Sequence, residues 1–114
     1  MKIDRFEDVI AWQKAGRLVL AIYDLLKNCR DYSFRDQMQR AAISVMNNIA
    51  EGFERRTDKD LKNFLFIAKG SCGEFRSMLY LALRLGYINK NDFDKLYNDS
   101  VEISKTLSGF IKTL

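Results

Sequence analysis

Apolar residues recur every three to four positions along nearly the whole chain, the spacing of one face of an α-helix. The four stretches with this spacing cover about residues 5–28, 34–54, 58–85 and 90–113. In the first stretch, the apolar positions are Ala11, Ala15, Leu18, Ile22 and Leu25. Each stretch is far longer than an ordinary strand. The pattern therefore predicts four long helices.

Polar side chains at the start of each stretch match the pattern of a capping box, in which a short acceptor is followed three residues later by an acid. The four pairs are Asp4 with Glu7, Ser33 with Asp36, Thr57 with Asp60, and Asn89 with Asp92. Gly86 follows the third stretch at the usual stop position of a helix. The chain contains no proline, so none of these helices is expected to kink.

Short joints between long helices make neighbouring helices antiparallel. We therefore expect an all-α protein that folds as an antiparallel up-down-up-down four-helix bundle. The 114 residues are enough to bury one core, and no linker, repeat or low-complexity segment divides them. We expect one domain over residues 1–114.

Composition narrows the classes of function. Hydrophobic residues at 47% and charged residues at 30% are typical of a globular protein. No long apolar run or cleavable leader is present, so we expect a cytoplasmic protein without a membrane partner. The net charge of +4 is compatible with a polyanion as partner and does not require one.

Residues for catalysis or metal binding are scarce. The chain has no histidine, and Cys29 and Cys72 are far apart and outside any CxxC spacing, so we expect no metal, no cofactor and no redox site. Without the usual general base, we expect no enzyme and no small-molecule substrate. A hydrolase that uses Glu51 or Glu74 is the open alternative, and it would need a metal or a concave pocket.

A stripe of hydrogen-bonding side chains follows the second helix, beside its apolar face. This polar stripe consists of Gln37, Arg40, Ser44, Asn48, Glu51 and Arg55. Amides, a hydroxyl and arginines make directional hydrogen bonds, whereas an ordinary solvated face is mostly Lys and Glu. The stripe is either such a solvated face or a polar network between helices or subunits. If facing residues of the second and third helices have numbers summing to about 112, Arg40 should pair with Glu74.

Glycines interrupt the third helix. Gly70 and Gly73 lie three residues apart, beside Ser71 and Ser77. Each interior glycine costs a helix about 1 kcal/mol relative to alanine, so a compensating contact is expected. Close approach of another helix, a second subunit or a phosphate would supply it, and the first two are favoured because this segment is not a phosphate-binding loop. Gly70, Ser71 and Glu74 therefore join the polar stripe as interface candidates.

Basic residues also follow the third helix. This basic line consists of Lys59, Lys62, Lys69, Arg76 and Arg84, with Tyr80 nearby. The spacing of seven from Lys62 to Lys69 and Arg76 places these side chains on one face, where they would suit an RNA or DNA backbone. An ordinary exposed face of a bundle has similar stripes.

The segment Gln37-Met-Gln-Arg40-Ala-Ala-Ile-Ser44-Val-Met-Asn-Asn48-Ile-Ala-Glu51-Gly52-Phe-Glu-Arg55 resembles the hallmark of the bacterial 23S rRNA intervening-sequence protein family. The resemblance continues through Trp12-Gln-Lys14-Ala15, Phe64-Leu-Phe-Ile-Ala68-Lys-Gly70-Ser71, Glu74 and Leu85-Gly86-Tyr87-Ile88. Many members of the family that it resembles have a proline in the loop before the second helix and another within that helix, where this chain has Arg30 and Met46. The resemblance therefore implies the fold and leaves the geometry of that loop open.

The resemblance implies a short four-helix bundle, encoded in some bacteria within an inserted segment of a large-subunit rRNA gene. Related bundles, including the accessory proteins of diversity-generating retroelements, assemble as pentameric rings that bind nucleic acid. A ring needs two different faces of each subunit, and the polar stripe and the glycines would suit them. We therefore expect a homo-oligomer, a pentamer, that binds structured RNA or another nucleic acid. An oligomeric protein-binding scaffold without a nucleic-acid role is the alternative.

Overall fold

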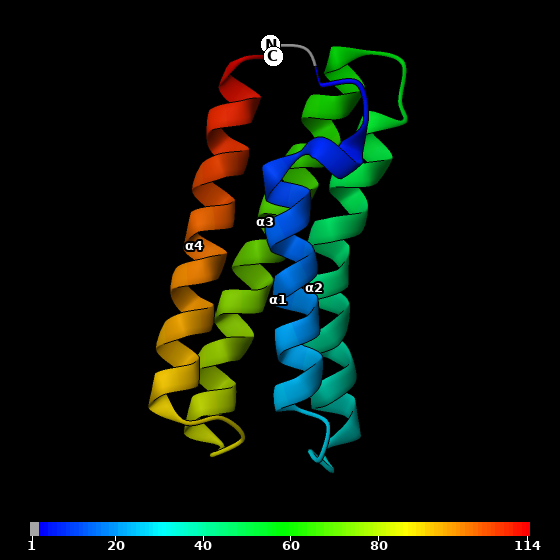
Figure 1. Ribbon diagram of the computed structural model, residues 1–114. Coiled ribbons are helices and arrows are strands. Elements are labelled where there is room, and N and C mark those ends of the chain that lie inside the picture. Colours follow the sequence, from blue (N-terminus) through cyan, green and yellow to red (C-terminus); the bar gives the residue numbers. More distant parts are fainter. Residues whose placement is uncertain (1–2) are drawn as a thin grey trace.

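Four long helices pack side by side in the computed structural model, which describes residues 3–114 (Figure 1). A short 3-10 turn, η1 (Phe6–Asp8), precedes α1 (Ile10–Leu25), α2 (Tyr32–Phe53), α3 (Asp58–Arg84) and α4 (Lys90–Lys112). Successive helices run in opposite directions, and the bundle measures 43 × 22 × 19 Å. Residues 3–114 contain no strand. The predicted all-α, up-down-up-down four-helix bundle is confirmed.

The core lies along the bundle axis, where each helix buries its apolar face. Its largest fully buried side chains include Leu18, Ile22, Met38, Ile49 and Phe75. Burying one such side chain contributes about 1.5–3 kcal/mol. The contact between α2 and α3 is the most extensive of the bundle, and that between α1 and α4 is the least extensive among the long helices. No helix of residues 3–114 is both long and apolar enough to cross a bilayer.

Helix starts agree with the capping predictions for α3 and α4. The Thr57 hydroxyl accepts the Asp60 backbone N–H at 3.1 Å, and the Asn89 side-chain oxygen accepts the Asp92 N–H at 2.8 Å. Both capping residues have extended backbone angles, as a residue just before a helix does. Each bond satisfies an amide that has no partner within the helix.

The capping predictions for the first two helices are wrong. The first helix begins at Ile10, because residues 6–8 form η1 and Val9 is extended and buried; Asp4 caps neither element. The second helix is capped by Asp31, whose carboxylate accepts the Phe34 N–H at 3.2 Å, so Ser33 lies inside the helix.

Gly86 ends the third helix as predicted. Its φ of 77° lies in the left-handed region, which glycine adopts without a steric penalty. The Gly86 N–H donates to the Leu83 carbonyl at 3.1 Å, and the Tyr87 N–H donates to the Ala82 carbonyl at 2.9 Å. These two bonds are those of a Schellman motif. The chain thereby reverses into α4.

Candidate functional site

The basic line runs the length of α3, along the side that faces α4. Lys59 and Lys62 lie exposed near the start of the helix, and Arg84 lies exposed at its end. Lys69 and Arg76 are half-buried between them. The Arg76 guanidinium reaches α4, where its Nη1 donates to the Ser100 hydroxyl at 3.4 Å. From Lys59 to Arg84 the line is about 38 Å long, at 1.5 Å per helical residue.

The five cations of the basic line have no carboxylate partner within residues 3–114. Ion pairs elsewhere on the molecule include those of Lys14 with Glu102 and of Lys90 with Asp94. None of the ion pairs in this range joins a carboxylate to a member of the basic line. The positive charge of this face is therefore not neutralised by a direct ion pair inside the bundle.

Two further cations extend this charge onto α4, and the sequence pattern did not identify them. Arg76 lies opposite Ser100, so residue numbers that face one another across α3 and α4 sum to 176. By this register, Lys105 lies within a turn of Lys69, and Lys112 lies within a turn of Lys62. Both α4 lysines are exposed and form no ion pair in the part of the chain that is described. The register between the two helices is the signal that identifies them.

The middle of the polar stripe forms a network between α2 and α3. The hydroxyls of Ser44 and Ser71 hydrogen-bond at 2.9 Å. The Asn48 side-chain amide donates to the Ser44 carbonyl at 2.8 Å and to the Ser44 hydroxyl at 2.9 Å. All three residues are half-buried. This part of the stripe is the predicted network between helices.

The ends of the polar stripe make local contacts, except that the Arg55 guanidinium also lies 5.0 Å from the centre of the Phe64 ring on α3. Arg55 and Glu51 form an ion pair at 3.3 Å within α2, and both are exposed. The Gln37 amide donates to the Ser33 hydroxyl at 3.4 Å. Exposed pairs of this kind contribute little to stability. These residues form an ordinary solvated face of the single chain.

The predicted ion pair between Arg40 and Glu74 is wrong. Both side chains are exposed, and no ion pair joins them. Because Ser44 lies opposite Ser71, facing residue numbers sum to 115 instead of about 112. Arg40 is therefore level with Phe75, whose side chain is buried in the core.

The glycines of α3 do not mark a close approach within the chain. A Cβ placed on Gly70 would meet no atom within 4 Å, and one on Gly73 would meet only the Arg76 guanidinium, at 3.7 Å. The close approach of α2 and α3 occurs instead at Gly52, where a Cβ would lie 2.9 Å from Phe64 Cβ and 3.0 Å from Leu61 Cδ1. Another helix of the same chain therefore does not explain Gly70.

Apolar side chains remain exposed on α3, beside Gly70. They are Phe66, Ile67, Leu81 and Leu85, each about half exposed. At 100° per residue, Ile67, Gly70, Glu74, Leu81 and Leu85 fall on one stripe, which borders α2 on one edge and the basic line on the other. Phe66 lies outside this stripe, at the same angle around the helix as Arg84 of the basic line.

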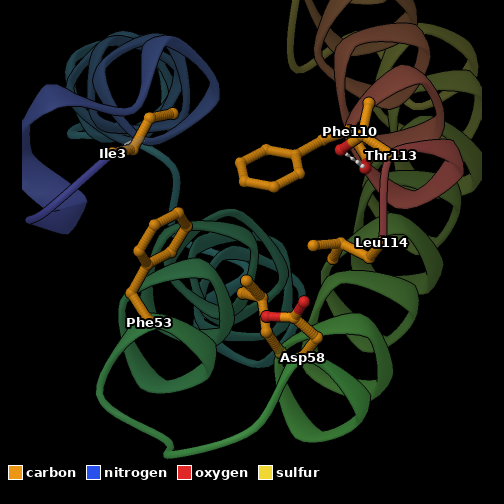
Figure 2. Close-up of a pocket in the computed structure, with 7 residues that line it drawn as sticks. Ile3, Phe53, Asp58, Phe110, Thr113 and Leu114 are labelled. Atoms are coloured by element: carbon orange, nitrogen blue, oxygen red, sulfur yellow. Dashed lines mark hydrogen bonds between the residues drawn. The ribbon is translucent and has the colours of Figure 1, made fainter. Parts of the chain in front are cut away.

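A pocket opens at the end of the bundle where α2 meets α3 (Figure 2). Its volume is about 340 Å³, and it is lined by Ile3, Phe53, Asp58, Leu61, Phe110, Thr113 and Leu114. The rings of Phe53 and Phe110 meet edge to face, 5.6 Å apart. Neither Glu51 nor Glu74 lines it. Asp58 is its one carboxylate side chain, so the pocket has no paired acid and base for hydrolysis.

The buried thiol of the core is also poorly suited to catalysis. Burial raises the pKa of the Cys72 thiol to about 11, against the opposing effect of the Arg76 charge. A thiol with this pKa is protonated at neutral pH and is a poor nucleophile. Among the described residues, no group of three or more Cys, Asp or Glu side chains is placed to hold a metal ion.

Comparisons with known proteins agree with this geometry. The family model of the 23S rRNA-intervening sequence protein matches residues 7–109. A crystal structure of a protein of unknown function from the S23 ribosomal protein family of Bacteroides thetaiotaomicron is 29% identical to this chain. The superposition has a TM-score of 0.84 and covers 90% of this chain and 99% of that one. No curated protein matches the chain.

Proposed function

The chain belongs to the 23S rRNA-intervening sequence protein family, as its residues predict, and on this premise we propose that it binds structured RNA or another nucleic acid. In this proposal, the protein is a non-enzymatic homo-oligomer, a pentamer, in the bacterial cytoplasm. The basic line on α3 contacts the phosphates, and the side of α3 that borders α2 contacts the next subunit.

The observation that carries the proposal is the unpaired charge of the basic line. Its five cations, from Lys59 to Arg84, share one side of α3 and have no carboxylate partner within residues 3–114. Each cation that meets a phosphate releases condensed counterions, which favours binding. Lys105 and Lys112 on α4 lie exposed at the level of Lys69 and Lys62 and add positive charge to this half of the bundle. A partner with many closely spaced negative charges fits this surface best.

Assembly would use the side of α3 that borders α2. Gly70 has open space around it, so a neighbouring subunit can approach the helix backbone there. The exposed side chains of Ile67 and Leu81 lie on the same stripe and would be buried by that subunit. A ring needs two different faces on each subunit, and this stripe supplies one of them. The centre of this stripe lies about 110° around the helix from the centre of the basic line, so assembly leaves most of the phosphate-binding face open.

A protein-binding scaffold is the second candidate, and the exposed apolar side chains of α3 favour it. Leu81 is 47% exposed and Leu85, one turn later on the same stripe, is 48% exposed, and apolar side chains grouped on one exposed surface are typical of an interaction site. A protein partner that covers them would bind mainly through apolar contacts. Its affinity would change little with salt, whereas that of a phosphate-binding surface falls steeply.

Charge reversal distinguishes the two candidates. We expect Lys62→Glu to weaken binding of a fluorescently labelled RNA hairpin and to reduce the salt slope of log K by about 1, because one cation no longer meets a phosphate. Lys95→Glu is the matched control, because it makes the same charge change on an exposed lysine that also forms no ion pair within residues 3–114 and that lies beside Lys14 of α1, away from the basic line. Fluorescence anisotropy at several salt concentrations measures both quantities. Equal weakening by the two variants would refute a role for the basic line.

A further inference from the structure

Three aromatic rings gather where α3 passes the first turns of α4. The Tyr80 ring meets Phe93 edge to face with centroids 5.2 Å apart, and it meets Tyr97 in the same manner at 5.7 Å. Phe93 and Tyr97 stack on each other at 5.6 Å. Phe93 is buried and Tyr97 is half-buried, whereas Tyr80 is 49% exposed. Two rings thus support a third ring that is open to water.

This exposed ring lies within the basic line. Arg76 precedes Tyr80 by one helical turn and Arg84 follows it by one turn, so the two arginines are about 12 Å apart along the helix axis. Hydrogen bonding to Tyr97 raises the pKa of Tyr80, and the Arg76 charge acts in the opposite direction as the smallest of the causes. Tyr80 is therefore uncharged at neutral pH and does not repel a phosphate.

The surroundings of the cluster are also suited to an anion. On α4, the ammonium group of Lys90 lies 5.3 Å from the centre of the Phe93 ring. The same ammonium group forms an ion pair with Asp94, which neutralises a carboxylate near the start of α4. The cluster is thus an aromatic surface bordered by cations.

We infer that Tyr80 is a stacking platform for an unpaired base, with Arg76 and Arg84 on the phosphates to either side. The inference rests on the proposed function and names its ligand more closely: a single-stranded segment of nucleic acid, such as a loop of a structured RNA. In a duplex, bases stack on each other and leave no ring face for Tyr80. An unpaired base has a free face, and stacking on an aromatic side chain is available to every base.

Contacts with Phe93 and Tyr97 preorganise the Tyr80 ring for binding. A tyrosine held by two neighbouring rings loses little side-chain freedom when a base stacks on it. A tyrosine alone on an exposed helix would lose more. The arginines add charge and, as planar groups, can also stack on a base.

Binding of single-stranded and duplex RNA by three variants tests this inference. The probes are labelled oligouridine and a labelled RNA stem without a loop, made of two complementary strands, each about 12 nucleotides or base pairs long. Tyr80→Leu keeps an apolar side chain against Phe93 and removes the aromatic face, and Tyr80→Phe keeps the face and removes the hydroxyl. Tyr32→Leu is the matched control, because Tyr32 is a tyrosine 59% exposed at the start of α2, outside the basic line.

We expect oligouridine to bind more tightly than the stem, and Tyr80→Leu to weaken oligouridine binding about tenfold. Tyr80→Phe and Tyr32→Leu should bind like the unaltered protein. Oligouridine with 5-iodouridine should crosslink to Tyr80 on irradiation, and mass spectrometry of the linked peptide identifies the residue. A circular dichroism spectrum of each variant shows whether it is folded. Because Tyr80→Phe keeps the aromatic face, a loss of binding by this variant in its folded state would refute stacking.

Failure of the inference differs from failure of the proposed function. If Lys62→Glu weakens binding but the stem binds as well as oligouridine and Tyr80→Leu has no effect, the basic line binds duplex phosphates and the stacking inference is wrong. If neither probe binds at any salt concentration, the proposed function itself is wrong, and a protein is then the remaining candidate to bind the aromatic cluster.

Discussion

Two glycines on neighbouring helices should respond in opposite ways to the same substitution. At Gly52, an added methyl group would lie 2.9 Å from Phe64 Cβ, which cannot move without the α3 backbone, and 3.0 Å from Leu61 Cδ1. Such overpacking costs about 1–3 kcal/mol. The better helix propensity of alanine offsets about 1 kcal/mol of it. We expect Gly52→Ala to lower the free energy of unfolding by up to about 2 kcal/mol.

Gly70→Ala provides the matched comparison. A methyl group there meets no atom of the same chain within 4 Å, so only the gain in helix propensity applies. We expect the free energy of unfolding of the isolated chain to rise by about 1 kcal/mol. At this chain length, that corresponds to a rise in Tm of about 4 °C.

Urea unfolding followed by circular dichroism at 222 nm measures both changes. The two variants should differ by about 1–3 kcal/mol in the free energy of unfolding. Runs at several protein concentrations separate the stability of the chain from that of its assembly, because an oligomer becomes more stable as concentration rises. If Gly52→Ala is as stable as Gly70→Ala, the close packing of α2 on α3 at Gly52 is refuted. If Gly70→Ala leaves the oligomer intact, the proposed close subunit approach at Gly70 is refuted.

Three further substitutions test single contacts. Asp31→Ala should lower the free energy of unfolding by about 1 kcal/mol or more and Ser33→Ala by much less, because only Asp31 caps α2; thermal unfolding compares the two. Ser71→Ala should cost about 0.5–1.5 kcal/mol by removing the 2.9 Å hydroxyl contact to α2, and an unchanged urea midpoint would contradict that network. Hydrogen bonding to Lys14 lowers the pKa of Glu102, so its contribution is present above the ordinary carboxyl pKa and disappears as pH falls through the lowered value. The stability difference between the unaltered protein and Glu102→Gln should therefore shrink between about pH 7 and pH 3, and a constant difference would be inconsistent with this pair.

The fold could be predicted because its signals are long and local. Apolar positions at helical spacing continue for more than twenty residues in each of α2, α3 and α4, which leaves little ambiguity between helix and strand. The stop at Gly86 depends on one backbone conformation that glycine favours. The caps at Thr57 and Asn89 were predictable for the same reason, since the acceptor and the amide are three residues apart.

The errors occurred where distant contacts decide between neighbouring polar groups. Asp31 and Ser33 are both able to cap α2 by local rules, but the second carboxylate oxygen of Asp31 also accepts the Tyr87 hydroxyl at 2.7 Å. This contact comes from the loop after α3, so the sequence near Ser33 does not reveal it. The first helix start was misplaced for a similar reason: the Phe6 ring packs on Trp12 at 5.2 Å and holds η1 against α1.

The candidate site was predicted in outline only. Spacing alone placed the basic line on one side of α3, because it lies on a single helix. The register between α2 and α3 differs by three residues from the predicted one, and the predicted ion pair between Arg40 and Glu74 does not form. The lysines of α4 and the support of Tyr80 by Tyr97 depend on the register between α3 and α4. Helical periodicity within one segment carries no information about that register.

The measurement that tests the central claim most directly is the solution mass of the purified protein, with and without nuclease treatment. Light scattering gives the mass, and the ratio of absorbance at 260 nm to that at 280 nm reports bound nucleic acid. We predict a protein assembly of about 67 kDa, five times the chain mass of 13.3 kDa, that carries nuclease-sensitive nucleic acid. A monomer of 13.3 kDa without nucleic acid would contradict both the assembly and the binding.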